Sequence, residues 1–187
     1  MKVHALTLFA AVTLAQAGAL SLSGTVGGAV TPDTRLSAWT VKTNGQPAEE
    51  LGGAGIKDSQ FTLTLPAVLP SSENLRPVDS RISWPGIVDF EKASAPAQVA
   101  ELRFYTYRDQ NANGVRDENE ALREVRLNTG KGVVFVVWAS NDVVVSGSKG
   151  YQASLKQGWN ALEVEVRSSV SVRPLEAKTP LSTNLGP

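Results

Sequence analysis

Residues 101–120 read ELRFYTYRDQNANGVRDENE, and this stretch decides the fold of the chain. Its first part, residues 101–107, places aromatic and β-branched residues in period-2 alternation. Such alternation predicts a half-buried β-strand rather than a helix. The second part, residues 109–120, is polar and contains the turn dipeptide Asn113-Gly114, so it predicts a loop. A strand that leads directly into a polar loop indicates a β scaffold.

The oxygen-bearing residues of this loop match the ligand spacing of a twelve-residue calcium loop. Ca²⁺ takes about six to eight oxygen ligands, from side chains at loop positions 1, 3, 5, 9 and 12 and from the backbone carbonyl at position 7, with glycine at position 6. Gly114 occupies position 6. The predicted metal ligands are Asp109, Asn111, Asn113, Val115, Asp117 and Glu120. The sequence therefore predicts one Ca²⁺ site.

A simpler interpretation of the same residues is a polar hairpin turn built on Asn113-Gly114. That interpretation explains one pair of residues and leaves the two aspartates and Glu120 without a role, so we prefer calcium. Three carboxylates predict modest affinity, with a Kd of about 10⁻⁴–10⁻³ M. Because the strand before the loop replaces the helix of a sensor pair, we expect a structural site rather than a switch.

Residues 104–125 resemble the calcium loops of secreted bacterial β-sandwich modules, in particular the B-repeat domains of the serine-aspartate-repeat adhesins. In that family the loop follows a strand, and calcium rigidifies an immunoglobulin-like domain. Residues 22–26 and 60–66 are more weakly similar to the opening of transthyretin-like, carboxypeptidase-regulatory-like sandwiches. These resemblances imply a sandwich fold and, for the first family, a structural or adhesive role in the bacterial cell envelope.

Turn residues separate several other short apolar or alternating segments, which predict further strands. The expected strands are residues 20–26, 35–41, 61–65, 81–84, 99–107, 132–139, 143–146, 151–155 and 161–166. Because helical periodicity is almost absent, we expect an all-β, antiparallel immunoglobulin-like or transthyretin-like sandwich of about 7–9 strands. Segment 132–139, apolar on both faces, should be the most buried. We expect 143–146 to pair back onto it and 151–155 to pair with 161–166.

Proline and glycine mark the segments expected to be irregular. Residues 66–98 predict a long Pro-rich loop, with Trp84 and Phe90 as candidate contacts for a ligand or as anchors that hold the loop on the sandwich. Residues 52–55 read GGAG without the Lys-Ser/Thr of a phosphate loop, so they predict a flexible loop. The expected domain covers residues 20–173, and residues 174–187 are expected to be a disordered tail.

The N-terminus has the pattern of a targeting segment. Lys2 precedes an apolar run, and small residues at 15, 17 and 19 provide cleavage sites, so residues 1–19 predict a signal peptide. We therefore expect a secreted protein, periplasmic or extracellular, with no transmembrane segment in the mature chain. No cysteine follows the apolar run, which argues against a lipid anchor.

Composition excludes several classes of chemistry. Removal of residues 1–19 would leave no Cys, His or Met, because the chain contains no Cys and its single His and Met lie at positions 4 and 1. Disulfides, Ser-His-Asp triads and the usual zinc, copper and haem ligands are then missing. The 18 basic and 18 acidic residues of the whole chain balance, so no basic surface for nucleic acid is expected.

Three functions from different classes remain. The first is a non-enzymatic calcium-binding protein with a structural or adhesive role, whose partner is an envelope protein or a glycan. The second is a carbohydrate-binding module that stacks sugars on its aromatic residues, for which the candidates are Trp39, Trp84, Trp159, Tyr105 and Tyr107. The third, and least favoured, is a glycosidase that uses the carboxylates of Asp89 and Glu91.

Overall fold

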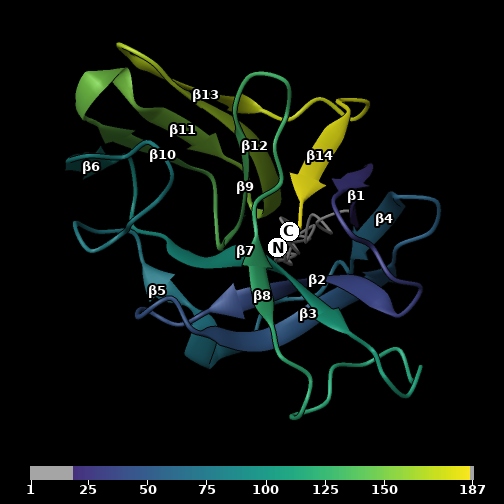
Figure 1. Cartoon of the computed structure of the whole chain (residues 1–187). Helices are drawn as coiled ribbons and strands as arrows, with labels where there is room; N and C mark the ends of the chain where they lie inside the picture. Colours follow the sequence, from purple (N-terminus) through teal and green to yellow (C-terminus); the bar gives the residue numbers. More distant parts are fainter. Residues whose placement is uncertain (1–18, 186–187) are drawn as a thin grey trace, which may run out of the picture.

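The computed structural model describes residues 19–185, so the predicted signal peptide lies outside the described residues except for Ala19. Within this range the chain forms β-strands and two short 3₁₀ helices, with no α-helix (Figure 1). The predicted all-β class is therefore confirmed. The elements are β1 (Leu20–Gly27), β2 (Thr34–Val41), β3 (Pro47–Gly55), β4 (Gln60–Leu65), η1 (Ser72–Asn74), β5 (Arg76–Pro77), β6 (Phe90–Ala93), β7 (Gln98–Arg108), β8 (Arg123–Val125), β9 (Val133–Ala139), β10 (Val143–Gly147), η2 (Ser148–Gly150), β11 (Gln152–Leu155), β12 (Gly158–Val166), β13 (Val170–Pro174) and β14 (Leu181–Asn184).

A large central sheet has the strand order β13-β12-β9-β7-β2-β3, and β5 and β8 also pair with β7. Two smaller sheets, β14-β1-β4 and β11-β10-β6, complete the fold. Every pairing is antiparallel except that of β1 with β14, which is parallel. The antiparallel sandwich predicted from the sequence is therefore present. It has additional strands, of which β3 with nine residues is the longest, whereas the strand expected at residues 81–84 is absent.

Two hydrophobic cores lie on opposite faces of the central sheet. Val134 and Val136 of β9 belong to the core formed with β1, β4 and β14. Phe135 and Val137 belong to the core formed with β10 and β11. Since neighbouring side chains of a strand point to opposite faces, a strand between two cores must be apolar throughout. This explains why β9 is buried along most of its length, as its sequence predicts.

Strand β4 shows the alternation expected for a strand with one solvent face. Phe61, Leu63 and Leu65 are buried, while Thr62 and Thr64 are exposed. The strand pairs with β1, and the hydroxyl groups of Thr62 and Ser23 form a 3.1 Å hydrogen bond across the two strands. The predicted inward face of this segment is confirmed.

The expectation of a long irregular loop over residues 66–98 is only partly correct. The segment contains η1 and the short strands β5 and β6, and β5 pairs with β7. Trp84 is 3% exposed and packs on Phe135 of β9. Burial of this side chain attaches the segment to the second core, so Trp84 anchors the segment rather than presenting a free contact surface.

Residues 52–55 also differ from expectation, because they lie in strand β3 and not in a flexible loop. Because these residues have small side chains or none, β3 can pack closely against its neighbour. A Cβ atom at Gly52 would lie 2.9 Å from the backbone oxygen of Thr64, closer than normal contact. Glycine therefore allows β3 to approach β4 closely. A glycine-rich sequence alone does not distinguish such a closely packed strand from a flexible loop.

Two predicted strand pairings are wrong. Strand β9 pairs with β12, and β10 pairs with β11, whereas the sequence order suggested that β9 would pair with β10 and β11 with β12. The turn at Asn141-Asp142 carries the chain from the central sheet into the smaller sheet, so it connects two layers of the sandwich. Short connections favour pairing of consecutive strands but do not require it.

The expectation of a disordered tail over residues 174–187 is wrong for most of its length. Strand β14 pairs with β1, and Leu181 and Leu185 are buried in the first core. The sandwich therefore extends beyond residue 173. Gly24 of β1 makes this close pairing possible, because a Cβ atom there would lie 2.4 Å from the backbone oxygen of Leu181.

An ionic cluster in which Glu163 is buried and Arg173 is exposed joins β12, β13 and the turn before β9. The Glu163 carboxylate is 7% exposed, accepts a hydrogen bond from the Thr129 hydroxyl and accepts one from Arg173 Nε at 2.6 Å. These two partners hold the pKa of Glu163 below its usual value although burial opposes them. The ionised side chain is therefore stabilised in the folded state.

We expect Glu163→Gln to weaken the acid sensitivity of the protein. A carboxylate whose pKa is lowered by folding contributes stability above its unfolded pKa and loses it as the pH falls through its folded pKa. Urea unfolding should therefore show a smaller loss of stability between about pH 7 and pH 3 in this variant than in the wild type. The exposed Glu176 supplies a control, and an equal change in Glu176→Gln would contradict the assignment.

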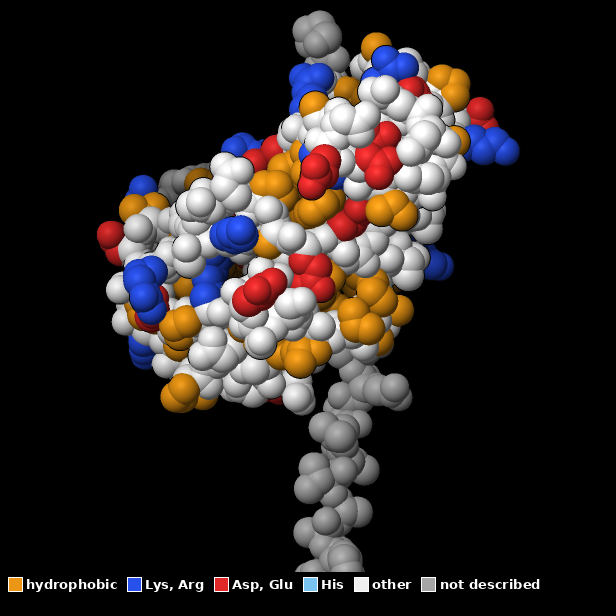
Figure 2. All heavy atoms as spheres, turned by 90° about the horizontal axis from the view of Figure 1, so that it is seen from below, with side chains coloured by type: hydrophobic (Ala, Val, Ile, Leu, Met, Phe, Trp, Pro, Cys, Tyr) orange, Lys and Arg blue, Asp and Glu red, His pale blue; other side chains and the backbone are white. Residues whose placement is uncertain are grey.

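Figure 2 shows the molecule from below the view of Figure 1. On this face, acidic and basic side chains are interspersed with apolar ones, so neither sign of charge dominates. The described residues, 19–185, contain no helix that could span a membrane.

Candidate metal centre

The predicted calcium loop connects β7 to β8 and projects from the end of these strands (Figure 1). Its two ends are held by the pairing of β7 with β8, in which Thr106 lies opposite Arg123. The backbone N–H of Asp109 also donates a 2.9 Å hydrogen bond to the carbonyl of Asp33, just before β2. The loop is therefore attached both to its own hairpin and to the neighbouring strand.

Asp109 organises the first half of the loop. Its side chain is only 5% exposed. Oδ1 accepts the backbone N–H of Asn113 at 3.0 Å, and Oδ2 accepts the N–H of Gly114 at 2.9 Å. Gly114 has a φ of 81°, a conformation that favours glycine, so the sixth loop position meets the turn requirement predicted from the sequence.

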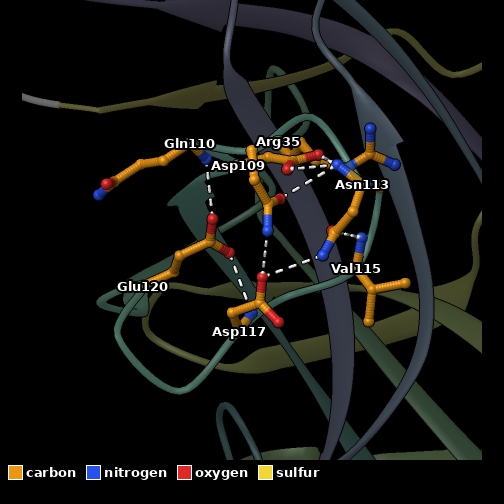
Figure 3. A network of polar contacts seen from close by, with 9 residues as sticks. Arg35, Asp109, Gln110, Asn113, Val115, Asp117 and Glu120 are labelled. Atoms are coloured by element: carbon orange, nitrogen blue, oxygen red, sulfur yellow. Dashed lines mark hydrogen bonds and ion pairs between the residues drawn. The ribbon is translucent and has the colours of Figure 1, made fainter.

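The two asparagines form successive turns around the second half. Asn111 Oδ1 accepts the N–H of Asn113, and Asn113 Oδ1 accepts the N–H of Val115. Their Nδ2 groups donate to the same oxygen, Asp117 Oδ2, at 2.8 and 2.9 Å (Figure 3). Side chains from loop positions 3, 5 and 9 therefore meet at one point.

Glu120 closes the loop from its last position. The side chain is 2% exposed, Oε1 accepts the N–H of Gln110 at 2.8 Å, and Oε2 accepts the N–H of Asp117 at 3.0 Å (Figure 3). One carboxylate therefore connects the second and ninth loop positions. Burial of an ionised carboxylate is unfavourable unless its oxygens are paired, and here both accept backbone hydrogen bonds.

The donor set suits a hard cation. The loop carries the carboxylates of Asp109, Asp117 and Glu120 and two asparagine amides, and oxygen donors of this kind are those that Ca²⁺ prefers. Asp117 Oδ2 now accepts hydrogen bonds from the side-chain amides of Asn111 and Asn113. To bind a cation, this carboxylate would have to give up these hydrogen bonds. Within residues 19–185, no three His, Cys, Asp or Glu side chains lie together as a metal site, so the three loop carboxylates would have to move toward one another to hold the ion.

Two residues that sequence reasoning missed lie against the loop. Arg35 of β2 places Nε 3.8 Å from Asp109 Oδ2, and the carboxylate of Glu50 of β3 accepts the backbone N–H of Arg116. Burial raises the pKa of Glu50, while this hydrogen bond and the charge of Arg35 partly oppose the increase. No local signal could identify these residues, since only the pairing of β2 with β7 brings Arg35 beside the loop.

The candidate sugar-stacking residues do not form an open platform. Trp84, Tyr105 and Tyr107 are each at most 5% exposed. The remaining two are half-buried, and their indole N–H groups already donate, from Trp39 to Ser37 Oγ and from Trp159 to the carbonyl of Pro66. Sugar stacking requires an exposed ring face, so most of these side chains are unsuitable without rearrangement.

The carboxylates proposed for glycosidase chemistry are both exposed. Asp89 directly precedes β6, and Glu91 lies within it. Comparison of the chain with protein-family models, with curated proteins and with solved structures finds no match.

Proposed function

We propose that this chain is a secreted, non-enzymatic β-sandwich protein whose loop at residues 109–120 binds Ca²⁺ as a structural ion. The observation that carries the proposal is the closed loop itself, in which the buried carboxylates of Asp109 and Glu120 hold the loop backbone from both ends. A cation bound by the loop would offset the negative charge of its three carboxylates.

The position of the loop favours stabilisation over signalling. It lies on a strand hairpin, and its first residue is bonded to the segment before β2. A cation bound here would connect the loop ends and stiffen the β7–β8 hairpin against β2. Sensor loops instead change the angle between two flanking helices, and this loop has strands on both sides.

The proposed role in the cell envelope rests on the targeting pattern and on the resemblance of residues 104–125 to adhesin modules. We propose a periplasmic or extracellular location and a partner that is an envelope protein or a glycan. The burial of Trp84, Tyr105 and Tyr107 favours this reading over a carbohydrate-binding module. The sequence after residue 19 contains neither Cys nor His, which favours a role without catalysis.

Thermal unfolding of residues 20–187 in EDTA and in about 10–100 mM CaCl₂, which is about 100 times the expected Kd, tests the site. At a Ca²⁺ concentration about 100 times the Kd, binding to the folded state alone adds about 2.7 kcal/mol of stability. We therefore expect the Tm to rise by about 5–10 °C. The double variant Asp109→Ala, Glu120→Ala should lose this increase.

Glu118→Gln provides the matched control, because Glu118 occupies loop position 10 and its carboxylate is not a predicted ligand. This variant removes one negative charge from the same loop and should keep most of the Tm increase. Unfolding curves of the wild type that coincide in EDTA and CaCl₂ would contradict the proposal and leave a polar turn at Asn113-Gly114.

A further inference from the structure

Arg35 lies on strand β2, outside the loop, and its charge is close to the predicted ligand Asp109. Its Nε lies 3.8 Å from Asp109 Oδ2, and its side chain is 23% exposed (Figure 3). In the pairing of β2 with β7, Arg35 lies opposite Tyr107, two residues before Asp109. The sheet register therefore fixes a positive charge beside the first loop position.

Three glycines lie next to this guanidinium. A Cβ atom added at Gly53 or Gly55 of β3, or at Gly114 of the loop, would lie 3.8–3.9 Å from an Arg35 nitrogen. The guanidinium is thus enclosed by β3 on one side and by the calcium loop on the other. The charge of Glu50, also on β3, interacts with it as well.

The contact between Arg35 and Asp109 is ionic rather than a hydrogen bond. The distance of 3.8 Å exceeds that of an N–H···O bond, and buried Nε has no hydrogen-bond partner in the described part of the chain. Asp109 instead uses its oxygens for the N–H groups of Asn113 and Gly114. Arg35 can therefore neutralise Asp109 electrostatically without occupying its lone pairs.

We propose that Arg35 is a built-in counter-cation of the loop, which stabilises the metal-free loop and lowers its affinity for Ca²⁺. Without metal, the guanidinium offsets part of the negative charge of Asp109. With metal, the same charge lies close to a divalent cation and repels it. This inference rests on the proposed function, since it concerns the affinity of the same site.

The inference predicts opposite effects of one substitution on two measured quantities. Arg35→Met keeps an apolar side chain of similar length but removes the charge. In EDTA its Tm should fall below that of the wild type, because the loop carboxylates lose their counter-charge. In calorimetric titration with CaCl₂ its affinity should rise, by about three- to tenfold at low salt.

Two further variants separate the local charge from general effects. Arg35→Lys keeps the charge and should bind Ca²⁺ with nearly the affinity of the wild type. Arg108→Met removes the same charge one residue before Asp109, but Arg108 is 65% exposed and pairs with Asp33. Its Ca²⁺ affinity should change by less than about twofold, since an exposed and already paired charge is strongly screened.

The possible outcomes distinguish this inference from the proposed function. Equal affinity of the wild type and Arg35→Met, or weaker binding by Arg35→Met, overturns the role of Arg35 and leaves the calcium site intact. Absence of binding by the wild type and by every variant overturns both. Binding by Arg35→Met alone supports the counter-cation and places the wild-type affinity below the titrated range.

Discussion

Removal of residues 181–187 is expected to lower the free energy of unfolding by about 3–6 kcal/mol. Two leucines, Leu181 and Leu185, leave the first core, and burial of each such side chain contributes about 1.5–3 kcal/mol. The β1 edge also loses its parallel partner from Gly24 to Gly27. In addition, the mutual backbone hydrogen bonds between Asn128 and Ser182, of 2.8 and 2.9 Å, are broken.

Urea unfolding followed by far-UV circular dichroism measures this loss. Leu181→Ala gives a milder test in case the truncated protein does not fold, with an expected destabilisation of about 2–5 kcal/mol. Ser182→Ala is the matched control, because this side chain is exposed on the other face of β14. A truncated protein as stable as the full chain, within about 1 kcal/mol, would show that β14 is not part of the cooperative fold.

Trp84→Ala is expected to destabilise the protein by about 3–5 kcal/mol. The Trp84 ring is buried in the second core, where its centroid lies 5.2 Å from that of Phe135 with a 45° angle between the planes. The truncation would leave a cavity between the 66–98 segment and β9. Because the indole N–H has no acceptor among the described residues, Trp84→Phe should cost much less.

Chemical unfolding again gives the comparison, and Val88→Ala serves as a control in the same segment because Val88 is 63% exposed. A small effect of Trp84→Ala, similar to that of the control, would indicate that the 66–98 segment is held only loosely. That result would support the alternative role of Trp84 as a ligand contact. A large effect establishes the residue as an anchor of the sandwich.

The sequence by itself determined the features that depend on neighbours in the chain. Period-2 alternation identified β4 and its inward face, and an apolar run identified β9 as a strand buried on both faces. The loop at residues 109–120 was likewise defined by local spacing, including glycine at the position that adopts a φ of 81°. These signals are local because side-chain direction and turn geometry are set over a few residues.

Only the tertiary structure decided which distant segments meet. The pairing of β9 with β12, the addition of β14 to β1 and the position of Arg35 beside Asp109 all join residues far apart in sequence. Any strand edge offers the same backbone donors and acceptors, so the residues of a strand do not specify their partner. The partner of each strand is decided by contacts such as the burial of Leu181 and Trp84 and the close approach at Gly24. These contacts exist only once the sheets have packed.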